Sequence, residues 1–424
     1  MEKIIRELRN CIGILAVAII VGIGMQTLVY LLPISPIKNH VFKSVDLLTE
    51  EGDYTEFLPS IFVRLHPYNM EFHTLLLNNR GMARDNYTDA LMLGEAAFDD
   101  GGMTSAFQKA LLVFHDEAVM HRTIDSLVEY SKNGVVTVAE AYPRYWHGYL
   151  VVLKPLLLVF TYKQIRILNA ILLVILFALV CIGICKKIGF GVCMSYALAS
   201  LMTFPFVIPY CMQYCTMTYI TLISMNVMLY AREKVESKES EFFLLVGVIT
   251  AYIDFLTYPV MALGCLLILR IALNEQKTQM KEVIVCSLTW GLGYAGMWAS
   301  KWIIADLFTE ENVICDAVNQ AVHRTVGDSD QLAAKVTPIR AIAANLSCYT
   351  NVLFLFMMLI VLFVLALNIY KNGISKNWKA YIFVACIPIM WMCVLQNHSY
   401  DHSSFTYRAF LVSFFGWEMI SSGK

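Results

Sequence analysis

The sequence predicts an all-α fold: a polytopic transmembrane helical bundle of about nine to eleven spans, with a mostly helical extracytoplasmic first loop and an interfacial helix. Composition is the first reason. Hydrophobic residues make up 58% of the 424 residues and charged residues only 15%, whereas soluble domains carry about 25% charged residues. The second reason is the grouping of apolar residues into long segments. The third is the alternation of Lys- and Arg-rich connections with connections whose short turns carry almost no Lys or Arg.

The first apolar segment, residues 11–32, is long enough to cross a bilayer core about 30 Å thick. It exceeds the hydrophobic region of a signal peptide, and no small-residue cleavage site follows it, so we expect a retained helix. Lys3, Arg6 and Arg9 precede this segment, which predicts a cytoplasmic amino terminus. Residues 1–34 are therefore predicted as a cytoplasmic tail and first transmembrane helix.

Residues 35–161 are predicted as an extracytoplasmic loop region that ends in an interfacial helix. The polar part, residues 35–147, is longer than a connector, and its apolar residues recur at helical spacing. The apolar run that follows is too short to cross the bilayer and carries Lys154 and Pro155 in its middle. Trp146 and the neighbouring tyrosines suit the headgroup region, so we expect this run to lie in the outer interface.

Residues 162–424 are predicted as a transmembrane helical bundle with outer loops. The remaining apolar segments are residues 165–185, 190–208, 214–230, 242–256, 260–272, 283–308, 352–369, 380–395 and 409–420. The last of these is short, and its length leaves open whether it crosses the membrane.

The connections between these segments fall into two classes that alternate along the chain. One class is rich in Lys and Arg and is predicted to be cytoplasmic: Lys186-Lys187, "AREKVESKESE", "LNEQKTQMKE" and "KNGISKNWK". We call the other class the outer connections: residues 35–147, 209–213, 254–259, 309–349 and 396–408. The alternation predicts that they all lie on the extracytoplasmic side, where they gather carboxylates, imidazoles and guanidinium groups.

Asp85 and Asp89 are the candidate catalytic carboxylates of the first outer connection. They are four residues apart, so a helix would place them on one face, and Asn86 and Tyr87 between them are residue types that bind sugars. A structural alternative is equally compatible with the pattern. Asp85 can cap the amino end of a helix, and Asp89 can compensate the helix dipole in its first turn.

Candidate substrate-binding residues flank the interfacial run. Arg144 and His147 precede it, Lys154 lies within it, and Arg166 opens the next span. His147 can contact a lipid phosphate or simply occupy the interface. Lys154 and Arg166 can bind phosphate, but snorkelling toward the headgroups or positioning of the chain explains them as well.

His398, His402 and Arg408 are the candidate substrate-binding residues of the last outer connection. The two histidines are four residues apart, with Asp401 beside one of them, a spacing that can also bind a metal ion. No third ligand is evident in the sequence, so we assign no metal ligands and leave open a divalent cation as cofactor. Arg408 is interpreted as a partner for a phosphate or carboxylate.

The order of these features resembles the GT-C class of polytopic membrane glycosyltransferases. Within that class it is most similar to the bacterial relatives of protein mannosyltransferases and lipid A aminoarabinose transferases. The resemblance depends on the short segment "HGYLVVLKPLL" followed by "YKQIRILNAILLVILFALVCIGICKK", in which His147, Arg166 and Lys186-Lys187 occupy the matching places. The stretch from Phe204 to Glu233 resembles the next two spans of the family, so the similarity covers roughly the first 230 residues.

The resemblance implies an inverting glycosyltransferase of the bacterial plasma membrane. Such an enzyme moves a sugar from a polyprenyl-phosphate donor to a glycan, lipid or protein acceptor at the outer face, with an outer-loop carboxylate as base. The acidic pair that this class usually carries soon after the first span has no clear counterpart, so the family does not identify the base. A flippase or transporter for lipid-linked oligosaccharides and a lipid-linked glycan polymerase or ligase are alternatives. The net charge of −1 favours no nucleic-acid partner.

Overall fold

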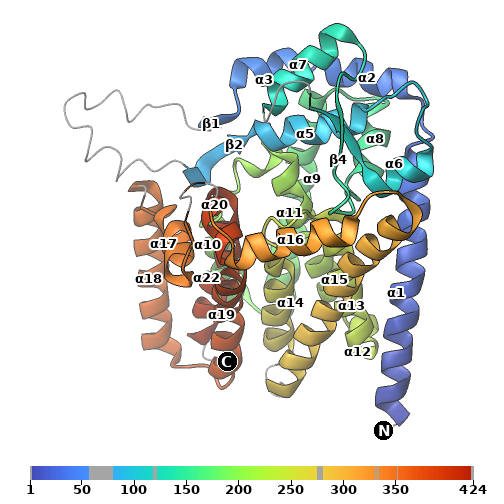
Figure 1. Cartoon of the computed structure of the whole chain (residues 1–424). Helices are drawn as coiled ribbons and strands as arrows, with labels where there is room; N and C mark the ends of the chain where they lie inside the picture. The colour runs from blue at the N-terminus through green and yellow to red at the C-terminus, as the bar shows by residue number, and fades with distance from the viewer. Residues whose placement is uncertain are drawn as a thin grey trace, which may run out of the picture.

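The computed structural model describes residues 2–56, 80–117, 122–274, 280–329, 331, 334–350 and 352–421. Helices account for 77% of the structure. Long helices run side by side, and a layer of short helices and strands covers the end of the bundle opposite the amino terminus (Figure 1). The mostly helical architecture predicted from the sequence is confirmed.

The bundle is built from the apolar segments and the short helices between them. It comprises α1 (Glu2–Val29), α9 (Tyr162–Lys187), α10 (Phe190–Leu201), η3 (Ile208–Tyr210), α11 (Met212–Tyr230), α12 (Arg232–Ser237), α13 (Glu239–Ile253), α14 (Val260–Leu273), α15 (Met280–Phe308), α16 (Val313–Val326), α17 (Pro338–Ser347), α18 (Val352–Asn372), α19 (Trp378–Val394), α20 (Gln396–Asp401), α21 (Ser403–Thr406), η4 (Tyr407–Phe410) and α22 (Leu411–Ile420). Each predicted apolar segment is thus helical over most of its length.

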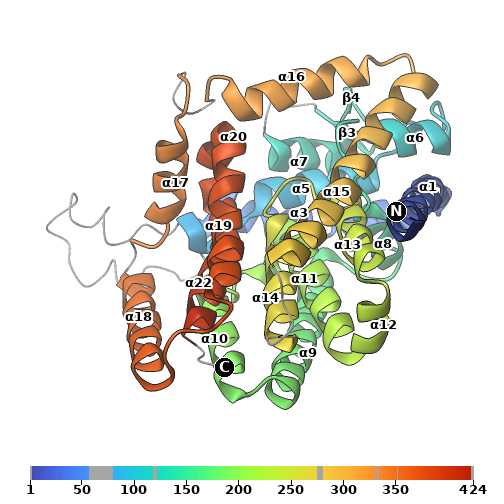
Figure 2. The same cartoon turned by 90° about the horizontal axis from the view of Figure 1, so that it is seen from below.

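Four helices of the described chain are long and apolar enough to cross a membrane: Arg6–Val29 of α1, Tyr162–Lys187 of α9, Met280–Phe308 of α15 and Leu353–Lys371 of α18. They indicate a multi-pass membrane protein. Shorter apolar helices of 10–17 residues, such as α14 and α19, lie among them. Seen from below, α1 and α18 lie at opposite edges of the bundle (Figure 2).

Two glycines allow α13 and α15 to approach closely. A Cβ on Gly247 would lie 2.1 Å from the carbonyl oxygen of Trp290, and a Cβ on Gly293 would lie 2.2 Å from that of Leu244. Neither position can hold a side chain without moving the facing backbone. Small residues at helix crossings are the usual means of close packing in membrane bundles, where apolar lipid reduces the hydrophobic drive for helices to associate.

We call the layer over the bundle the cap. It comprises α2 (Ile34–Phe42), α3 (Val45–Glu51), β1 (Tyr54–Glu56), η2 (Arg80–Met82), β2 (Ala83–Asp85), α5 (Asn86–Ala97), α6 (Ala106–Leu112), β3 (Phe114–Asp116), α7 (Thr123–Asn133), β4 (Ala139–Ala141) and α8 (Leu150–Leu157). The strands form two antiparallel pairs, β1–β2 and β3–β4, which the sequence did not predict. Three-residue strands are too short to show the alternation that identifies a strand.

The cap has its own hydrophobic core, to which α8 contributes. Leu150, Leu153 and Leu157 of α8 are buried against α2 and α5 residues, whereas Val152 is 58% exposed. The helix ends two residues after Pro155, whose ring cannot sit inside a longer helix without loss of a hydrogen bond. The short apolar run is therefore a short helix that packs one face on the cap core, closes one side of the cap and leaves apolar side chains exposed on its other face.

Candidate functional site

A cavity of about 870 Å³ lies where the cap meets the bundle. All five outer connections contribute side chains to its lining. Asp85 comes from the first, Gln213 from the second, Phe255 from the third, Arg324 from the fourth and His398 from the fifth. Segments far apart in the sequence thus converge on one polar chamber.

Asp85 stands at the junction of β2 and α5, on the cavity wall. One carboxylate oxygen accepts the backbone N–H of Thr88 at 3.0 Å, which caps α5. The other accepts the Thr88 hydroxyl at 3.0 Å and the side-chain amide of Gln213. Asp85 is therefore the helix-capping residue of the structural alternative, but the same side chain also faces the cavity.

Burial raises the pKa of Asp85, and its hydrogen bonds and the positive charge of Arg408 oppose the rise. The carboxyl is only 5% exposed, so desolvation of the anion is the largest influence. A raised pKa increases the basicity of the carboxylate. That suits a group that must accept a proton near neutral pH.

Asp89 lies one turn further along α5 but does not line the cavity. It is fully buried, accepts the backbone N–H of Met212 at 2.9 Å and is hydrogen-bonded to the Tyr162 hydroxyl. Burial raises the pKa of Asp89 to about 7. Tyr162 also lies 3.2 Å from the carbonyl of Tyr210, and its single proton can serve only one of these acceptors. If Asp89 is protonated, it donates its own proton to the Tyr162 oxygen, and the Tyr162 proton can then bond to the Tyr210 carbonyl. This arrangement agrees with the raised pKa of Asp89.

Asn86 and Tyr87 point in different directions. Asn86 is buried, where it accepts from Arg166 at 2.8 Å and donates to the Gly52 carbonyl at 2.8 Å. Tyr87 lines the cavity, and its ring stacks on that of Tyr54 with centroids 6.3 Å apart and planes 12° from parallel. Stacked aromatic faces of this kind give the cavity an apolar platform.

Arg144, Lys154 and Arg166 are engaged outside the cavity lining. Arg144 pairs with Asp316 of α16 at 3.1 Å, and Arg166 pairs with Glu51 of α3 at 2.9 Å. Lys154 is 1% exposed and donates to the carbonyl of Ala96 at 2.8 Å, although the sequence suggested snorkelling toward headgroups. The contacts of Arg144 and Arg166 hold the cap to the bundle, and the contact of Lys154 joins α8 to α5 within the cap. The predicted substrate contacts of these residues stay predictions.

His147 lines the cavity from a strained backbone. Its φ is +53°, which non-glycine residues seldom adopt. Nε2 donates to the carbonyl of Tyr142 at 2.9 Å, while Nδ1 lies 3.1 Å from the Tyr149 hydroxyl and 3.2 Å from a carboxylate oxygen of Glu95. The surrounding contacts over-determine this conformation, and such strain is frequent at functional sites.

Glu95 is a cavity residue that sequence reasoning missed. It is fully buried on α5, and one of its carboxylate oxygens is hydrogen-bonded to Tyr149. The other oxygen has no hydrogen-bond partner among the described residues. Burial and the nearby carboxylate of Glu95 raise the pKa of Tyr149, so its hydroxyl stays protonated. The signal was present in "LMLGEAAF", where one carboxylate interrupts an apolar helix segment.

His398 and Arg324 form the opposite side of the cavity. The Nη1 of Arg324 lies 3.2 Å from Nδ1 of His398, and a guanidinium can only donate, so Nδ1 accepts. Nε2 must then carry the proton, which it donates to the carbonyl of Leu256 at 2.8 Å. Burial and the charge of Arg324 hold the pKa of His398 well below its usual value. His398 is therefore neutral, and both of its nitrogens are engaged in hydrogen bonds, one of them with Arg324.

His402 and Arg408 complete the predicted set. His402 lines the cavity with its ring centroid 4.7 Å from that of His398. Arg408 is fully buried, where it donates to the carbonyl of Gly81 at 2.9 Å and lies over the ring of Tyr214 at 4.0 Å. It stands outside the lining and acts on the cavity through its charge on Asp85.

The structure thus brings Asp85, Tyr87, His147, His398 and His402 together in one chamber. The six other candidates hold the surrounding elements in place: Asn86, Asp89, Arg144, Lys154, Arg166 and Arg408. Arg80 and Arg324 supply the guanidinium groups of the lining. Neither residue was singled out from the sequence, because no pattern distinguishes them from the arginines that pair elsewhere.

A group of metal-ligating side chains, His115, Glu117 and Glu140, occurs in the described part of the cap, away from the lining of the cavity.

Comparison with known proteins gives no relatives: no model of a protein family, no curated protein and no solved structure matches this chain. The site is therefore interpreted from its own geometry.

Proposed function

We propose that this chain is a membrane glycosyltransferase that moves a sugar from a polyprenyl-phosphate donor to an acceptor hydroxyl at the outer face of the membrane. The observation that carries the proposal is the convergence of all five outer connections on one cavity that pairs a carboxylate with guanidinium groups. The order of spans that resembles GT-C enzymes supports the same reaction. The proposal includes about nine to eleven spans and a cytoplasmic amino terminus.

The reaction divides into two tasks that the cavity residues can perform. Asp85 accepts the proton of the acceptor hydroxyl as its oxygen forms a bond to the anomeric carbon of the sugar. The bond between that carbon and the phosphate oxygen breaks, and the electron pair leaves with the polyprenyl phosphate. Arg80 and Arg324 stabilise the negative charge that develops on this phosphate. Attack from the side opposite the leaving group inverts the anomeric configuration.

The aromatic residues of the lining suit the sugar. Tyr54 and Tyr87 stack on one wall, and Tyr145 and Phe255 pack edge to face on another with centroids 6.0 Å apart. Ligand sites combine such apolar surfaces with a few polar groups that fix orientation. The nonpolar C–H face of a hexose or pentose would lie on these rings, while Gln213 beside Asp85 contacts its hydroxyls.

The test uses the full-length protein in lipid vesicles with a panel of short-chain polyprenyl-phosphate hexoses and pentoses and an extract of envelope acceptors. We expect the wild type to consume one donor, release polyprenyl phosphate and give a product of inverted configuration. Asp85→Asn should lower the rate by about 10²–10⁴. The control is Asp46→Asn, which alters an exposed acid of the same loop and should leave the rate unchanged.

Three results would contradict the proposal. Wild-type rates in Asp85→Asn would remove the assigned base. A wild type that moves the donor across the bilayer without releasing polyprenyl phosphate would indicate the flippase alternative. Growth of the product by whole repeat units would indicate a polymerase instead.

A further inference from the structure

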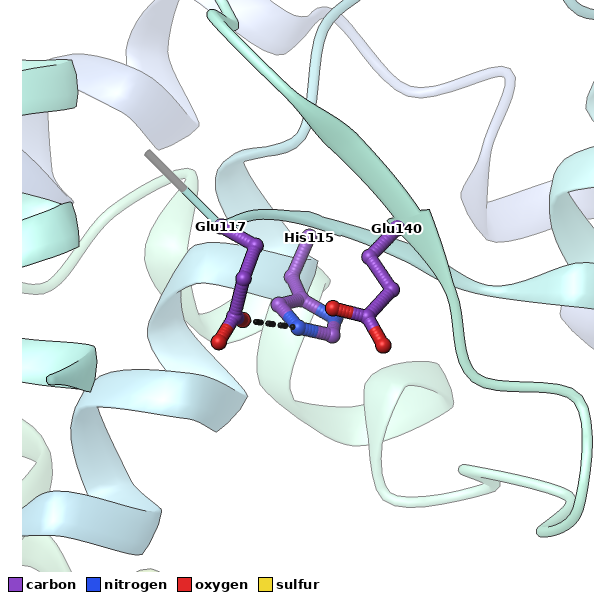
Figure 3. Close-up of side chains that lie close together, drawn as sticks. All are labelled: His115, Glu117 and Glu140. Atoms are coloured by element: carbon purple, nitrogen blue, oxygen red, sulfur yellow. Dashed lines mark hydrogen bonds and ion pairs between the residues drawn. The ribbon is translucent and has the colours of Figure 1, made fainter. Parts of the chain in front are cut away.

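Three side chains of the cap converge at the β3–β4 pair, outside the lining of the cavity: His115, Glu117 and Glu140 (Figure 3). One potential ligand atom from each lies within 4.8 Å of the other two. Nε2 of His115 is 2.8 Å from a carboxylate oxygen of Glu117. The imidazole ring stands between the two carboxylates in the view of Figure 3.

The backbone register is the reason these side chains meet. His115 lies directly opposite Glu140 in the antiparallel pair, and side chains of facing residues point to the same side of a sheet. Glu117 is two residues beyond His115, so strand alternation presents it on that side as well. The N–H of Glu117 donates to the carbonyl of Val138 at 2.9 Å, which continues the pairing past the end of β3. The constellation is thus set by main-chain hydrogen bonds.

The burial of His115 is a second, independent observation. The residue is only 9% exposed, and its Nδ1 is buried with no hydrogen-bond partner among the described residues. A buried polar atom without a partner costs about 1–3 kcal/mol. An imidazole that is buried beside two carboxylates and has one nitrogen without a hydrogen-bond partner is well placed to serve as a metal ligand.

We propose that His115, Glu117 and Glu140 bind one divalent cation, with Zn²⁺ as the best match to their chemistry. Imidazole nitrogen and carboxylate oxygen bind Zn²⁺ at about 2.0–2.2 Å, which in a tetrahedron separates ligand atoms by about 3.4 Å. Small side-chain rotations bring the three atoms from their present separations to that spacing. The fourth position is left for water, and the exposed Glu140 gives the ion access from solvent.

The ion joins β3 to β4 immediately before the wall of the cavity. Tyr142, one residue past β4, donates its N–H to the carbonyl of Val113 at 2.8 Å and accepts from Nε2 of His147 at 2.9 Å. The ring centroids of His115 and Tyr142 are 6.3 Å apart. The site is therefore a clamp that fixes the position of Tyr142 and, through it, of His147. The binding of the ion itself does not depend on the proposed transfer reaction.

The test measures metal binding by the full-length protein in detergent, with its exposed thiols blocked by N-ethylmaleimide and bound metal removed by chelation. Zn²⁺ is titrated by isothermal calorimetry, and thermal unfolding is recorded with and without the ion. We expect one tight site in the wild type. Glu140→Gln should weaken binding at least tenfold and abolish the rise in melting temperature. Glu129→Gln, which alters a partly exposed Glu of α7, is the matched control and should bind as the wild type does.

Glu140 is exposed, so its substitution leaves the fold intact and keeps the test decisive even where His115→Ala fails to fold. A wild type with no stoichiometric Zn²⁺ site would overturn the proposal. So would equal affinity in the wild type and Glu140→Gln. Neither result would bear on the transferase, because no donor is present in this experiment.

Discussion

The turn at Gly148 provides a sharp test of how the cap is fixed to the bundle. Its N–H donates to the carbonyl of Tyr252 in α13 at 2.8 Å, and Gln26 of α1 donates to the carbonyl of His147 at 3.3 Å. A Cβ at position 148 would lie 2.4 Å from that Tyr252 oxygen and 2.5 Å from a carbon of its ring. Gly148→Ala must therefore displace the turn or α13.

The magnitude follows from the clash and the lost hydrogen bond. Carbon and oxygen atoms that are not bonded normally stay at least about 3.3 Å apart. The turn at Gly148 and α13 must therefore separate by roughly 1 Å. Overpacking of this kind costs about 1–3 kcal/mol, and breaking the hydrogen bond costs about 0.5–1.5 kcal/mol. We expect Gly148→Ala to lower the free energy of unfolding by about 2–4 kcal/mol, as measured by denaturant titration in detergent with far-ultraviolet circular dichroism.

Gly94→Ala is the matched control for this substitution. Gly94 lies inside α5, and a Cβ there meets nothing within 4 Å. Replacing a glycine inside a helix stabilises it by about 0.5–1 kcal/mol, so the control should be neutral or more stable. Equal stability of Gly148→Ala and the wild type would refute the close contact with Tyr252. If both variants lost the same free energy of unfolding, the loss would reflect a general sensitivity of the cap to substitution and not the contact with Tyr252.

Three further substitutions test buried polar groups that stabilise the cap or join it to the bundle. Asp89 has a folded pKa of about 7, so its contribution to stability is full below about pH 4 and is lost as pH rises through 7. Asp89→Asn should remove about 2–4 kcal/mol of that pH dependence, measured as unfolding midpoints between pH 4 and 8. Burial lowers the pKa of Lys154 to about 7, so wild-type stability should rise from pH 7 to 10, and Lys154→Met should reduce that rise, measured as unfolding midpoints between pH 7 and 10. Arg166→Gln should cost about 1–3 kcal/mol because it removes one of the two arginines paired with Glu51 and leaves the buried side-chain oxygen of Asn86 without its donor, and the double variant with Glu51→Gln should lose less than the two single losses added together.

Hydropathy and charge predicted the parts of the fold that depend on solvent. The apolar segments are helices because a long apolar run is stable only where its backbone hydrogen bonds are internal. The outer connections were grouped because they alternate with the Lys- and Arg-rich connections, and all five contribute side chains to the cavity. That grouping needed no knowledge of tertiary contacts, which is why it could be obtained from one sequence.

The identity of the cavity residues was only partly predictable. Asp85 and Asp89 share a helix and a residue type, yet one faces the chamber and the other faces Tyr162 and Met212. The difference depends on which neighbour packs on each face of α5, and local sequence does not contain that information. Glu95 was not predicted from the sequence because its neighbours are apolar, which is typical of a helix that only packs in a core.

The most direct test of the account is the side of the membrane on which the cavity lies. Cys315 lies in α16, and Cys185 lies near the carboxyl end of α9. Both thiols are exposed and free. Intact cells are treated with a membrane-impermeant maleimide, and the modified peptides are mapped by mass spectrometry. If the cavity lies on the extracytoplasmic side, Cys315 reacts in intact cells and Cys185 reacts only after permeabilisation. Protection of Cys315 until the membrane is opened would contradict this placement, because Arg324 of the same helix and the whole chamber would then face the cytoplasm.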